Sequence, residues 1–504
     1  MLDAMQEVRT TGLRADRWTL PEPPPRRTPE QSRTLVLASL STLLVLMSFV
    51  TPLGTAARTA ADVGGGAGSV PWLLSAMALG LAVSLLPSGA FADDLGRRRV
   101  LVVGLTLLAL GSVLCAVAGS STAFVAGRLL SGLGAGAVLA CGLGLIGHAF
   151  PPGPARGHAT GVWGASVGAG IGTGGLLTVV VDQGTSWRHT YVVVAVLAVV
   201  LAVAGRLLLV ESTADVRRRP DLLGAALLGT GLAALLAALV EVREGVTAEV
   251  VGLVLSGALL VGGFVLAENR VSAPMLDLAL LRRRPFLAAS VGSFTNGAGA
   301  TALAAFTPTL VQRGLGRSLL AASVLVLLFA GTSVATALPV KRLPATWTSR
   351  RLLVGGLLGV AVGQLAQTGL TVDCSLARLV PGTLVVGVAF GVLNATLGRE
   401  AVASVPADRS ALGSGANNTF RYVGSALGIS LVAVIATRAP GADGLVAGWT
   451  TAGLVTAGLS VLGALVVLAL RPLPVAVEPA QPRPSQASTS SASSSPTTRW
   501  PSGE

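Results

Sequence analysis

One short stretch places acidic and basic side chains close together between two long apolar runs. It reads Gly89-Ala-Phe-Ala-Asp93-Asp94-Leu-Gly96-Arg97-Arg98-Arg99-Val-Leu101. A carboxylate such as Asp93 can accept backbone N–H groups or pair with an arginine, and Gly96 permits a tight turn. This chemistry is ion pairing at a turn rather than catalysis. The stretch alone leaves two interpretations open, a specific polar latch or an ordinary basic loop at a membrane surface.

Other polar residues fall inside the apolar runs. At membrane depth an arginine such as Arg128 costs about 2.5–3.5 kcal/mol, so it normally faces the protein interior. The alternative is that its long side chain reaches the membrane surface. Asn417 and Arg421, four residues apart, share one helix face, which we expect to line a cavity. Four further residues are weaker cavity candidates, because each can equally form hydrogen bonds between helices. They are Asn296, Gln364, Gln367 and Asn394.

The chain lacks the residue patterns of hydrolases, metalloenzymes and ATP-driven pumps. Its cysteines, Cys115, Cys141 and Cys374, do not have the spacing of metal ligands. No H-E-x-x-H motif and no G-x-x-x-x-G-K-[ST] motif occurs, and the histidines fall at the ends of apolar runs. We therefore expect no enzyme activity, no cofactor and no metal site.

The composition is that of a polytopic membrane protein. Of 504 residues, 52% are hydrophobic and only 12% are charged, and the mean hydropathy is +0.74. Soluble domains carry about 25% charged residues, so this chain cannot cover a soluble surface. The apolar runs do not alternate as the strands of a membrane barrel would, and they are long enough to span as helices. The net charge of +13 is spread through loops, which argues against nucleic acid as a partner.

The apolar runs predict an all-α protein with fourteen transmembrane helices in the order six, two, six. The runs cover 34–54, 71–92, 99–119, 122–147, 157–181, 190–210, 222–240, 249–267, 286–311, 318–340, 351–370, 378–398, 411–437 and 446–470. The predicted domains are a disordered cytoplasmic arm (1–33), a six-helix bundle (34–211), a two-helix insert with its cytoplasmic loops (212–285), a second six-helix bundle (286–470) and a disordered cytoplasmic tail (471–504).

The arginines of the loops fix the predicted orientation, because basic residues are enriched on the cytoplasmic side. With the N-terminus inside, basic clusters such as Arg97–Arg99, Arg217–Arg219 and Arg282–Arg284 all fall in inside loops. The outside loops hold only isolated arginines. Both termini are therefore expected in the cytoplasm.

The two six-helix blocks carry an internal repeat. Arg98-Arg99-Val-Leu-Val-Val-Gly104-Leu echoes Arg350-Arg351-Leu-Leu-Val-Gly-Gly356-Leu. Downstream, Arg128 and Gly132 have counterparts in Arg378 and Gly382, and the pair Gly161 and Gly172 has counterparts in Gly413 and Gly424. Two halves repeated in the same orientation are one transporter architecture, with substrate bound between them at mid-membrane.

On these residues the chain resembles the major facilitator superfamily, and within it the fourteen-helix drug:proton antiporters, over about residues 34–470. The family motif G-x-L-A-D-R-x-G-R-K-x-x-L is matched at Gly89, Asp93, Gly96 and Arg97, while Asp94 stands in place of its first arginine. Arg98 takes the place of its lysine. The resemblance implies the major facilitator fold, with this stretch as a conformational latch that stabilises the outward-facing state.

Two further motifs support the resemblance. The family pattern R-x-x-Q-G is matched by Arg128-Leu-Leu-Ser131-Gly132, which implies that Arg128 takes part in proton coupling. The run around Ile171 resembles the antiporter signature G-P-x-x-G-G without its proline. Glycines three and four residues apart let a neighbouring helix approach closely, whatever else they do. The glycines singled out for this packing and antiport role are Gly168, Gly170, Gly172, Gly174 and Gly175.

One expected residue is absent. Family members usually carry an aspartate in helix 1, where this chain has Ser48, and we find no acidic residue in the middle of any predicted span. An embedded carboxylate normally serves proton coupling and helps to bind cationic cargo. We therefore hypothesise a neutral or anionic cargo and an atypical or absent proton coupling.

The sequence thus predicts a secondary transporter that exports small amphiphilic, drug-like compounds by alternating access. The alternatives are an uptake facilitator and a transport-dead membrane sensor or partner protein. The expected partners are a small-molecule substrate and the lipid bilayer, with protons as a candidate. The expected protein is a monomer in a bacterial plasma (inner) membrane.

Overall fold

The computed structural model describes residues 28–53, 55–65, 69–182, 186–214, 221–242, 245–271, 274–276, 278–342 and 347–470. These residues all belong to one compact unit. They contain helices and loops but no β-strand. Most of the predicted arm and the whole predicted tail lie outside the described residues.

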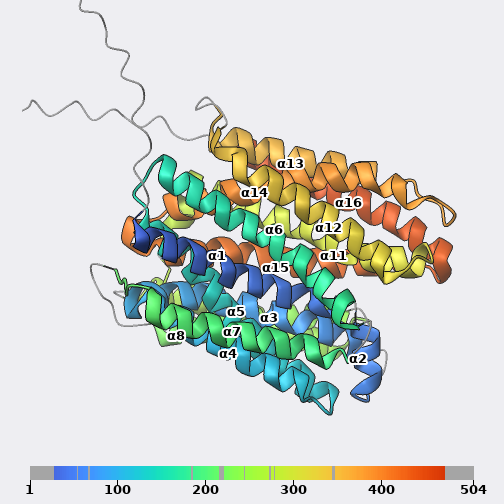
Figure 1. The fold of residues 1–504 in the computed structure, drawn as a ribbon, viewed down its shortest axis with the longest axis horizontal. Helices are drawn as coiled ribbons and strands as arrows, with labels where there is room; N and C mark the ends of the chain where they lie inside the picture. Colours follow the sequence, from blue (N-terminus) through green and yellow to red (C-terminus); the bar gives the residue numbers. More distant parts are fainter. Residues whose placement is uncertain are drawn as a thin grey trace, which may run out of the picture. The chain divides into compact units, whose positions relative to one another are not determined.

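The α-helices run side by side across the unit (Figure 1). They are α1 (Pro29–Val50), α2 (Ala56–Asp62), α3 (Ser69–Leu95), α4 (Arg97–Ala116), α5 (Ser121–Ala149), α6 (Pro154–Asp182), α7 (Arg188–Leu208), α8 (Leu222–Glu241), α9 (Ala248–Glu268), α10 (Arg284–Asn296), α11 (Ala302–Thr309), α12 (Leu319–Ala337), α13 (Ser349–Ala366), α14 (Val380–Ala403), α15 (Ser410–Ala436) and α16 (Gly441–Ala469).

The first long helix starts earlier than its apolar run. α1 begins at Pro29 rather than at residue 34, so the last residues of the predicted disordered arm are helical. Thr28 and Gln31 explain the start, because each side chain accepts the other residue's backbone N–H at 3.2 Å. This capping box satisfies donors that a helix end leaves unpaired. Gln31 also donates to the carbonyl of Ala149 at 3.0 Å, which ties α1 to the end of α5.

The helices on either side of α8 and α9 pack in matching ways. We call α1 to α7 the first half and α10 to α16 the second half. In the first half α3 and α4 pack on α5, and in the second half α12 and α13 pack on α14. Between the halves, α6 packs on α12 and α15 packs on α3. The crossing pairs α6/α12 and α15/α3 occupy corresponding places, as the sequence repeat predicts.

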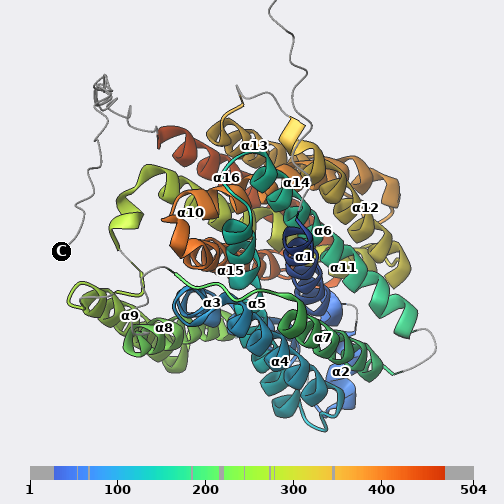
Figure 2. The same ribbon diagram turned by 60° about the vertical axis from the view of Figure 1, so that its left-hand side comes forward.

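The two helices of the insert are central in the sequence but peripheral in space (Figure 2). α8 packs on α3, and α9 packs mainly on α8. Trp72 Nε1 donates a 2.6 Å hydrogen bond to Glu241 Oε1, which holds α8 against α3. On α9 the side chains of Leu255 and Leu259 are 65% and 77% exposed, as suits a surface that faces lipid.

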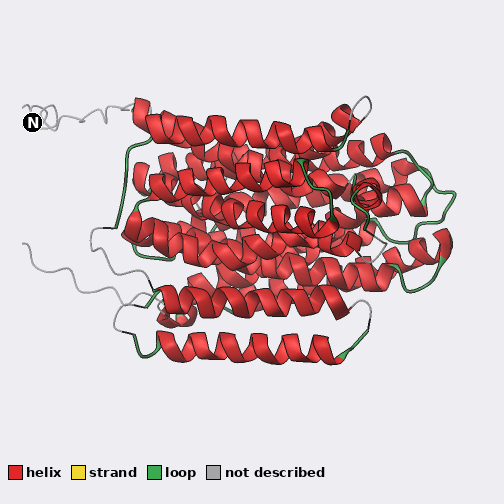
Figure 3. Cartoon of the chain, turned by 90° about the horizontal axis from the view of Figure 1, so that it is seen from below, coloured by secondary structure: helices red, strands yellow, loops and turns green. Residues whose placement is uncertain are grey.

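Eleven helices among the described residues are long and apolar enough to cross a membrane. They lie roughly parallel when the unit is seen from below (Figure 3). The rods formed by α6, by α10 with α11, and by α13 are outside this set of eleven. The count of fourteen spans therefore stays a prediction, while the all-helical membrane architecture is confirmed.

The predicted continuous helix over 286–311 needs correction. α10 ends at Asn296, and a π-helical turn (Gly297–Thr301), α11 and a second π-helical turn (Leu310–Gly314) follow. Pro308 inside α11 cannot donate a backbone hydrogen bond, which weakens the regular helix there. At Gly297 a Cβ would collide with the carbonyl oxygen of Arg421. Close packing against α15 thus coincides with the widened turn.

Candidate functional site

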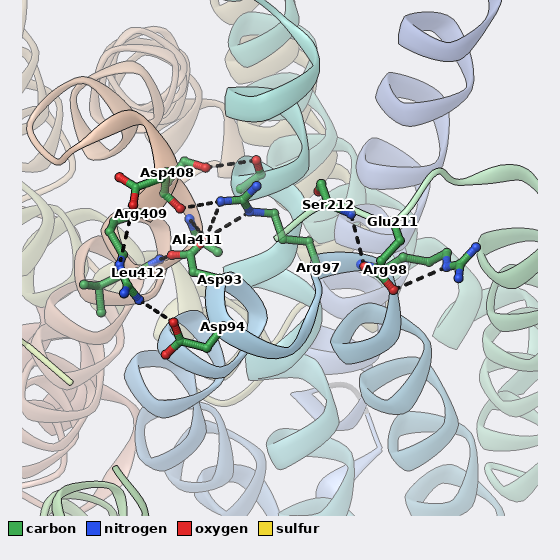
Figure 4. Close-up of polar contacts among 12 residues, drawn as sticks. Asp93, Asp94, Arg97, Arg98, Glu211, Ser212, Asp408, Arg409, Ala411 and Leu412 are labelled. Carbon is green, nitrogen blue, oxygen red and sulfur yellow. Dashed lines mark hydrogen bonds and ion pairs between the residues drawn. The ribbon is translucent and has the colours of Figure 1, made fainter. Parts of the chain in front are cut away.

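The acidic–basic turn lies where the two halves meet, at the end of α3 and the start of α4 (Figure 4). Asp93 accepts hydrogen bonds from Arg97 Nη2 at 2.6 Å and from Arg97 Nε at 2.9 Å. From the second half, the backbone N–H groups of Ala411 and Leu412 donate to Asp93 at 3.2 Å and 2.8 Å. These N–H groups belong to the first turn of α15, which has no side-chain cap from its own N-cap residue. Asp93 therefore caps a helix of the opposite half.

This contact is a desolvated ion pair with nearly complete hydrogen bonding. The side chains of Asp93 and Arg97 are both 0% exposed. Arg97 Nη2 also donates to the carbonyl of Asp408 in the second half at 2.6 Å. The positive end of the α15 dipole adds to the stabilisation of the Asp93 carboxylate. Removing either charged partner would leave the other buried and unpaired, at a cost of about 3–5 kcal/mol.

Asp94, which departs from the family motif, makes a second ion pair between the halves. Its Oδ1 lies 2.8 Å from Nη1 of Arg409, and the two side chains are 7% and 11% exposed. Arg409 comes just before α15 and also approaches Asp408 at 4.0 Å. In the sequence Arg409 belongs to no motif and lies between the apolar runs at 378–398 and 411–437. We call Asp93, Asp94, Arg97, Asp408 and Arg409 the Asp93 cluster.

Two glycines of the motif allow these approaches. Gly96 is the N-cap residue of α4 and has a φ of +118°, a left-handed conformation that favours glycine. A Cβ on Gly89 would lie 2.6 Å from the carbonyl oxygen of Ala411, so only glycine lets α3 and α15 pack this closely.

Glu211, which sequence reasoning did not single out, completes the turn within the first half. Its Oε1 accepts the backbone N–H of Arg98 at 3.0 Å, near the start of α4. Its Oε2 lies 3.5 Å from Nε of both Arg98 and Arg99. The available signal was an isolated acid directly after the last helix of the first half. Arg98 thus turns toward Glu211 rather than toward the second half.

Arg128 of α5 faces the interior of the first half, not the membrane surface. It is 0% exposed. Its Nη1 donates to the carbonyl of Ser48 at 2.8 Å, and its Nη2 to the carbonyl of Phe49 at 3.3 Å. Both acceptors are at the end of α1, where the helix tightens into a 3₁₀ turn at Thr51. Arg128 therefore holds the last turn of α1 through uncharged partners.

The glycines of α6 present two different faces. A Cβ on Gly170 or Gly174 would lie 2.5 Å or 2.6 Å from carbonyl oxygens of α1, so this pair faces the first half. A Cβ on Gly168 or Gly172 would lie 2.9 Å or 2.7 Å from α12 side-chain atoms, so this pair faces the second half. Gly175 has room for a Cβ, since the nearest atom would be 3.9 Å away. Close packing explains four of the five glycines.

A cavity lies between the halves, toward the opposite end from the Asp93 cluster. The last turns of α1 line it, as do the later residues of α6 and the first residues of α12 and α14. Its walls are mainly aliphatic and aromatic. The polar or charged side chains that line it are Thr178, Thr301, Thr307, Ser323, Gln364, Gln367, Thr383, Arg421, Tyr422 and Ser425. Among the described lining residues, arginine is the only charged type.

The structure brings only part of the predicted polar set to this cavity. Arg421 lines it, and its Nη1 donates to Asn394 Oδ1 at 2.9 Å, just behind the wall. Arg421 Nη2 donates to Asn418 Oδ1. Asn417 instead accepts from Ser293 of α10, and Asn296 is buried at the π-helical turn. Helical spacing predicts that Asn417 and Arg421 both line the cavity, but only Arg421 does, because Asn417 pairs with Ser293 of another helix.

Helices that enclose a cavity between two halves, with a polar contact at one end, are the arrangement of a multi-pass membrane transporter. The sequence profile of the Major Facilitator Superfamily matches residues 37–429. The chain belongs to this superfamily, whose transporters bind small-molecule substrates within the membrane.

Several relatives are identical to this chain at about a third of the aligned residues. The chain is 32% identical to the probable actinorhodin transporter of Streptomyces coelicolor, over 74% of this chain and 67% of that one. It is 31% identical to the puromycin resistance protein pur8 of Streptomyces alboniger, over 78% and 81%. It is 30% identical to the multidrug efflux pump LfrA of Mycolicibacterium smegmatis, over 82% and 83%.

Solved structures support the fold. The human organic anion transporter MFSD10 (TETRAN) superposes with a TM-score of 0.63 at 18% identity, covering 87% of this chain and 100% of that one. The proton:xylose symporter XylE gives 0.63 at 13% identity, over 87% and 95%. At these identities the likeness concerns the fold alone.

Proposed function

We propose that this protein exports small amphiphilic compounds by alternating access, with its two halves rocking around the central cavity. The observation that carries the proposal is that the two halves enclose a cavity and are joined by polar contacts at one side of it. The cavity is lined by both halves, and the Asp93 cluster joins both halves on the other side of it. Opening one end therefore requires breaking the cluster.

The direction of the proposed cycle follows from the predicted orientation. The basic loops put the Asp93 cluster and both termini on the cytoplasmic side of a bacterial plasma membrane. The described arrangement is then closed inside, with its cavity toward the outside. In this scheme Asp93, Gly89, Gly96, Arg97 and Arg98 act as the latch. The bundles at 34–211 and 286–470, with the insert at 212–285, are the proposed domains of a monomer.

The similar proteins favour export over uptake. They are described as an antibiotic transporter, an antibiotic resistance protein and a multidrug efflux pump. We propose the same direction here, with an antibiotic-like cargo. Gly168 and Gly172 of α6 serve as the close contact with α12 on which the halves move, and Arg128 couples the end of α1 to α5.

Residue 48 bears on whether transport is coupled to protons. Ser48 stands where the family has a helix-1 aspartate, and no carboxylate lines the described cavity. We therefore assign no proton to this cavity and expect a neutral or anionic cargo. Extrusion of a lipophilic cation against its gradient by energised vesicles would contradict that assignment.

The test is drug susceptibility and accumulation in a pump-deficient bacterial host. Cells that express the protein are compared with cells that express an Asp93→Asn variant, across a panel of aromatic antibiotics. We expect lower accumulation and higher resistance for at least one compound, with the gain reduced in the variant. A full panel with no altered accumulation, at verified membrane expression, would overturn the proposal.

A further inference from the structure

We infer that the cargo carries an anionic group, a carboxylate or phenolate on an aromatic body, and that Arg421 binds this group. The inference rests on the proposed function, because it takes the cavity between the halves as the cargo site. It adds the chemistry of the cargo and the residue that selects it.

The charge of Arg421 is held by neutral partners. Its hydrogen bonds go to the amide oxygens of Asn394 and Asn418, which carry no formal charge. By contrast, Arg97 and Arg409 of the Asp93 cluster each pair with a carboxylate. Arg421 is only 5% exposed, so water does little to solvate its charge. A buried cation without a counter-charge attracts an anion strongly, because the surrounding dielectric is low.

The two amides are fixed so that they support the guanidinium. Asn394 Nδ2 donates to the carbonyl of Phe390 at 2.9 Å, and Asn418 Nδ2 donates to the carbonyl of Ser414 at 3.0 Å. Each amide thus uses its N–H on the backbone of its own helix and turns its oxygen to Arg421. A guanidinium held at both Nη atoms keeps a fixed plane, which suits bidentate binding of a carboxylate.

Aromatic rings border the charge on the cavity side. The Arg421 guanidinium lies over the Tyr422 ring, with its carbon 5.1 Å from the ring centre. Tyr422 in turn meets Phe49 of α1 edge-on at 5.8 Å between ring centres. Phe49 is the residue whose carbonyl Arg128 holds. A ring of the second half therefore borders the cation, and a ring of the first half packs on that ring. This arrangement fits a flat aromatic cargo with an acidic substituent.

The depth of Arg421 suits a central site. It lies nine residues beyond Leu412, the residue capped by Asp93, which is about 14 Å along a helix. Arg421 therefore sits between the closed end and the rest of the cavity. A cationic cargo would meet a like charge here, while an anion would meet the one charged group of the described lining.

The test uses one aromatic body with three charges: anthraquinone-2-carboxylate, its methyl ester, and a trimethylammonium-methyl anthraquinone. Binding to the purified full-length protein is measured by quenching of tryptophan fluorescence. Uptake into inside-out vesicles is measured in parallel. The variants are Arg421→Gln, which removes the charge, and Arg421→Lys, which keeps it. Arg313→Gln is the matched control, because Arg313 is exposed and does not line the cavity.

We expect the wild type and Arg313→Gln to bind the carboxylate about tenfold or more tightly than the ester, the gain of charge-assisted hydrogen bonds. Arg421→Gln should lower that ratio to about 1 while ester binding persists, which shows a folded cavity. Arg421→Lys should retain a weakened preference.

A preference for the cation, or an unchanged ratio in Arg421→Gln, would overturn the inference. Export of all three compounds regardless of Arg421 would leave the exporter intact and refute the anion site. Arg421-dependent binding without any uptake would support the anion site and refute the proposed export.

Discussion

Asp93, at the boundary between the halves, makes two kinds of stabilising contact. Asp93 is at once the ion-pair partner of Arg97 and the cap of α15. Because Oδ1 of Asp93 accepts from both Arg97 and Ala411, one substitution removes a charge from the first half and disturbs a cap of the second.

Replacement of Asp93 by asparagine should destabilise the closed end. The amide keeps the size but loses the charge, so Arg97 stays buried without its counter-ion, at a cost of about 3–5 kcal/mol. We expect a lower thermal midpoint of the purified protein and faster labelling of a cysteine placed in the first turn of α15. Asp443→Asn, at an exposed position of α16, is the control and should match the wild type. Equal labelling rates in Asp93→Asn and wild type would argue against a latch.

Arg128 offers a matched comparison with its counterpart in the repeat, Arg378. Arg128 is fully buried, whereas Arg378 is exposed and donates to the carbonyl of Ala366 at 2.7 Å. Arg128→Ala leaves two buried carbonyls of α1 unpaired, each worth about 1–3 kcal/mol. We therefore expect at least a tenfold loss of transport with normal membrane insertion. Arg378→Ala should transport like the wild type, and Arg128→Ala behaving the same way would remove Arg128 from the mechanism.

At the scale of elements, α6 and α15 are the helices that cross between the halves. The glycines of α6 divide into a pair that faces α1 and a pair that faces α12. On α15, Gly415 plays a similar part, since a Cβ there would lie 2.4 Å from the backbone carbonyl oxygen of Leu85 in α3. Packing backbone against backbone lets long helices move as rigid rods rather than by deforming side chains.

Two adjacent glycines of α6 give a direct test of this packing. Gly174→Ala places a methyl group 2.6 Å from the carbonyl oxygen of Met47, so α6 must move away from α1. Overpacking of this kind costs about 1–3 kcal/mol. Gly175→Ala adds the same methyl group in open space, 3.9 Å from its nearest neighbour. We expect the thermal midpoint to fall in Gly174→Ala and to stay within error in Gly175→Ala, and similar midpoints would refute the packing assignment.

At the scale of the whole molecule, the closed end depends on polar contacts between residues more than three hundred positions apart in the chain. Asp94 and Arg409 are such a pair, separated by 315 residues. The Asp93 cluster meets the first turn of α15, and the cavity meets the middle of the same helix at Arg421 and Tyr422, so one helix connects the two sites.

A charge exchange tests this link. Asp94→Arg restores the arginine of the family motif but sets two arginines against each other, so we expect reduced transport and a lower thermal midpoint. The double variant Asp94→Arg with Arg409→Asp rebuilds the pair in reverse and should recover most of both. A double-mutant cycle should give a coupling of about 1–3 kcal/mol. No recovery in the double variant would show that the pair does not hold the halves together.

The sequence by itself determined the all-helical membrane class and singled out Asp93 and Arg128, because hydropathy and isolated charges are local properties. The six-two-six order of the spans stays a prediction. Only the tertiary structure decided which residues meet across the halves. Arg409 and Glu211 lie far from the motif in sequence, and their pairing depends on how α15 and the end of α7 pack on α3 and α4. The same holds for Arg421, whose neutral partners come from two helices and whose neighbour Asn417 turns to a third. Periodicity aligns residues on one helix, but contacts between helices fix what each buried charge meets.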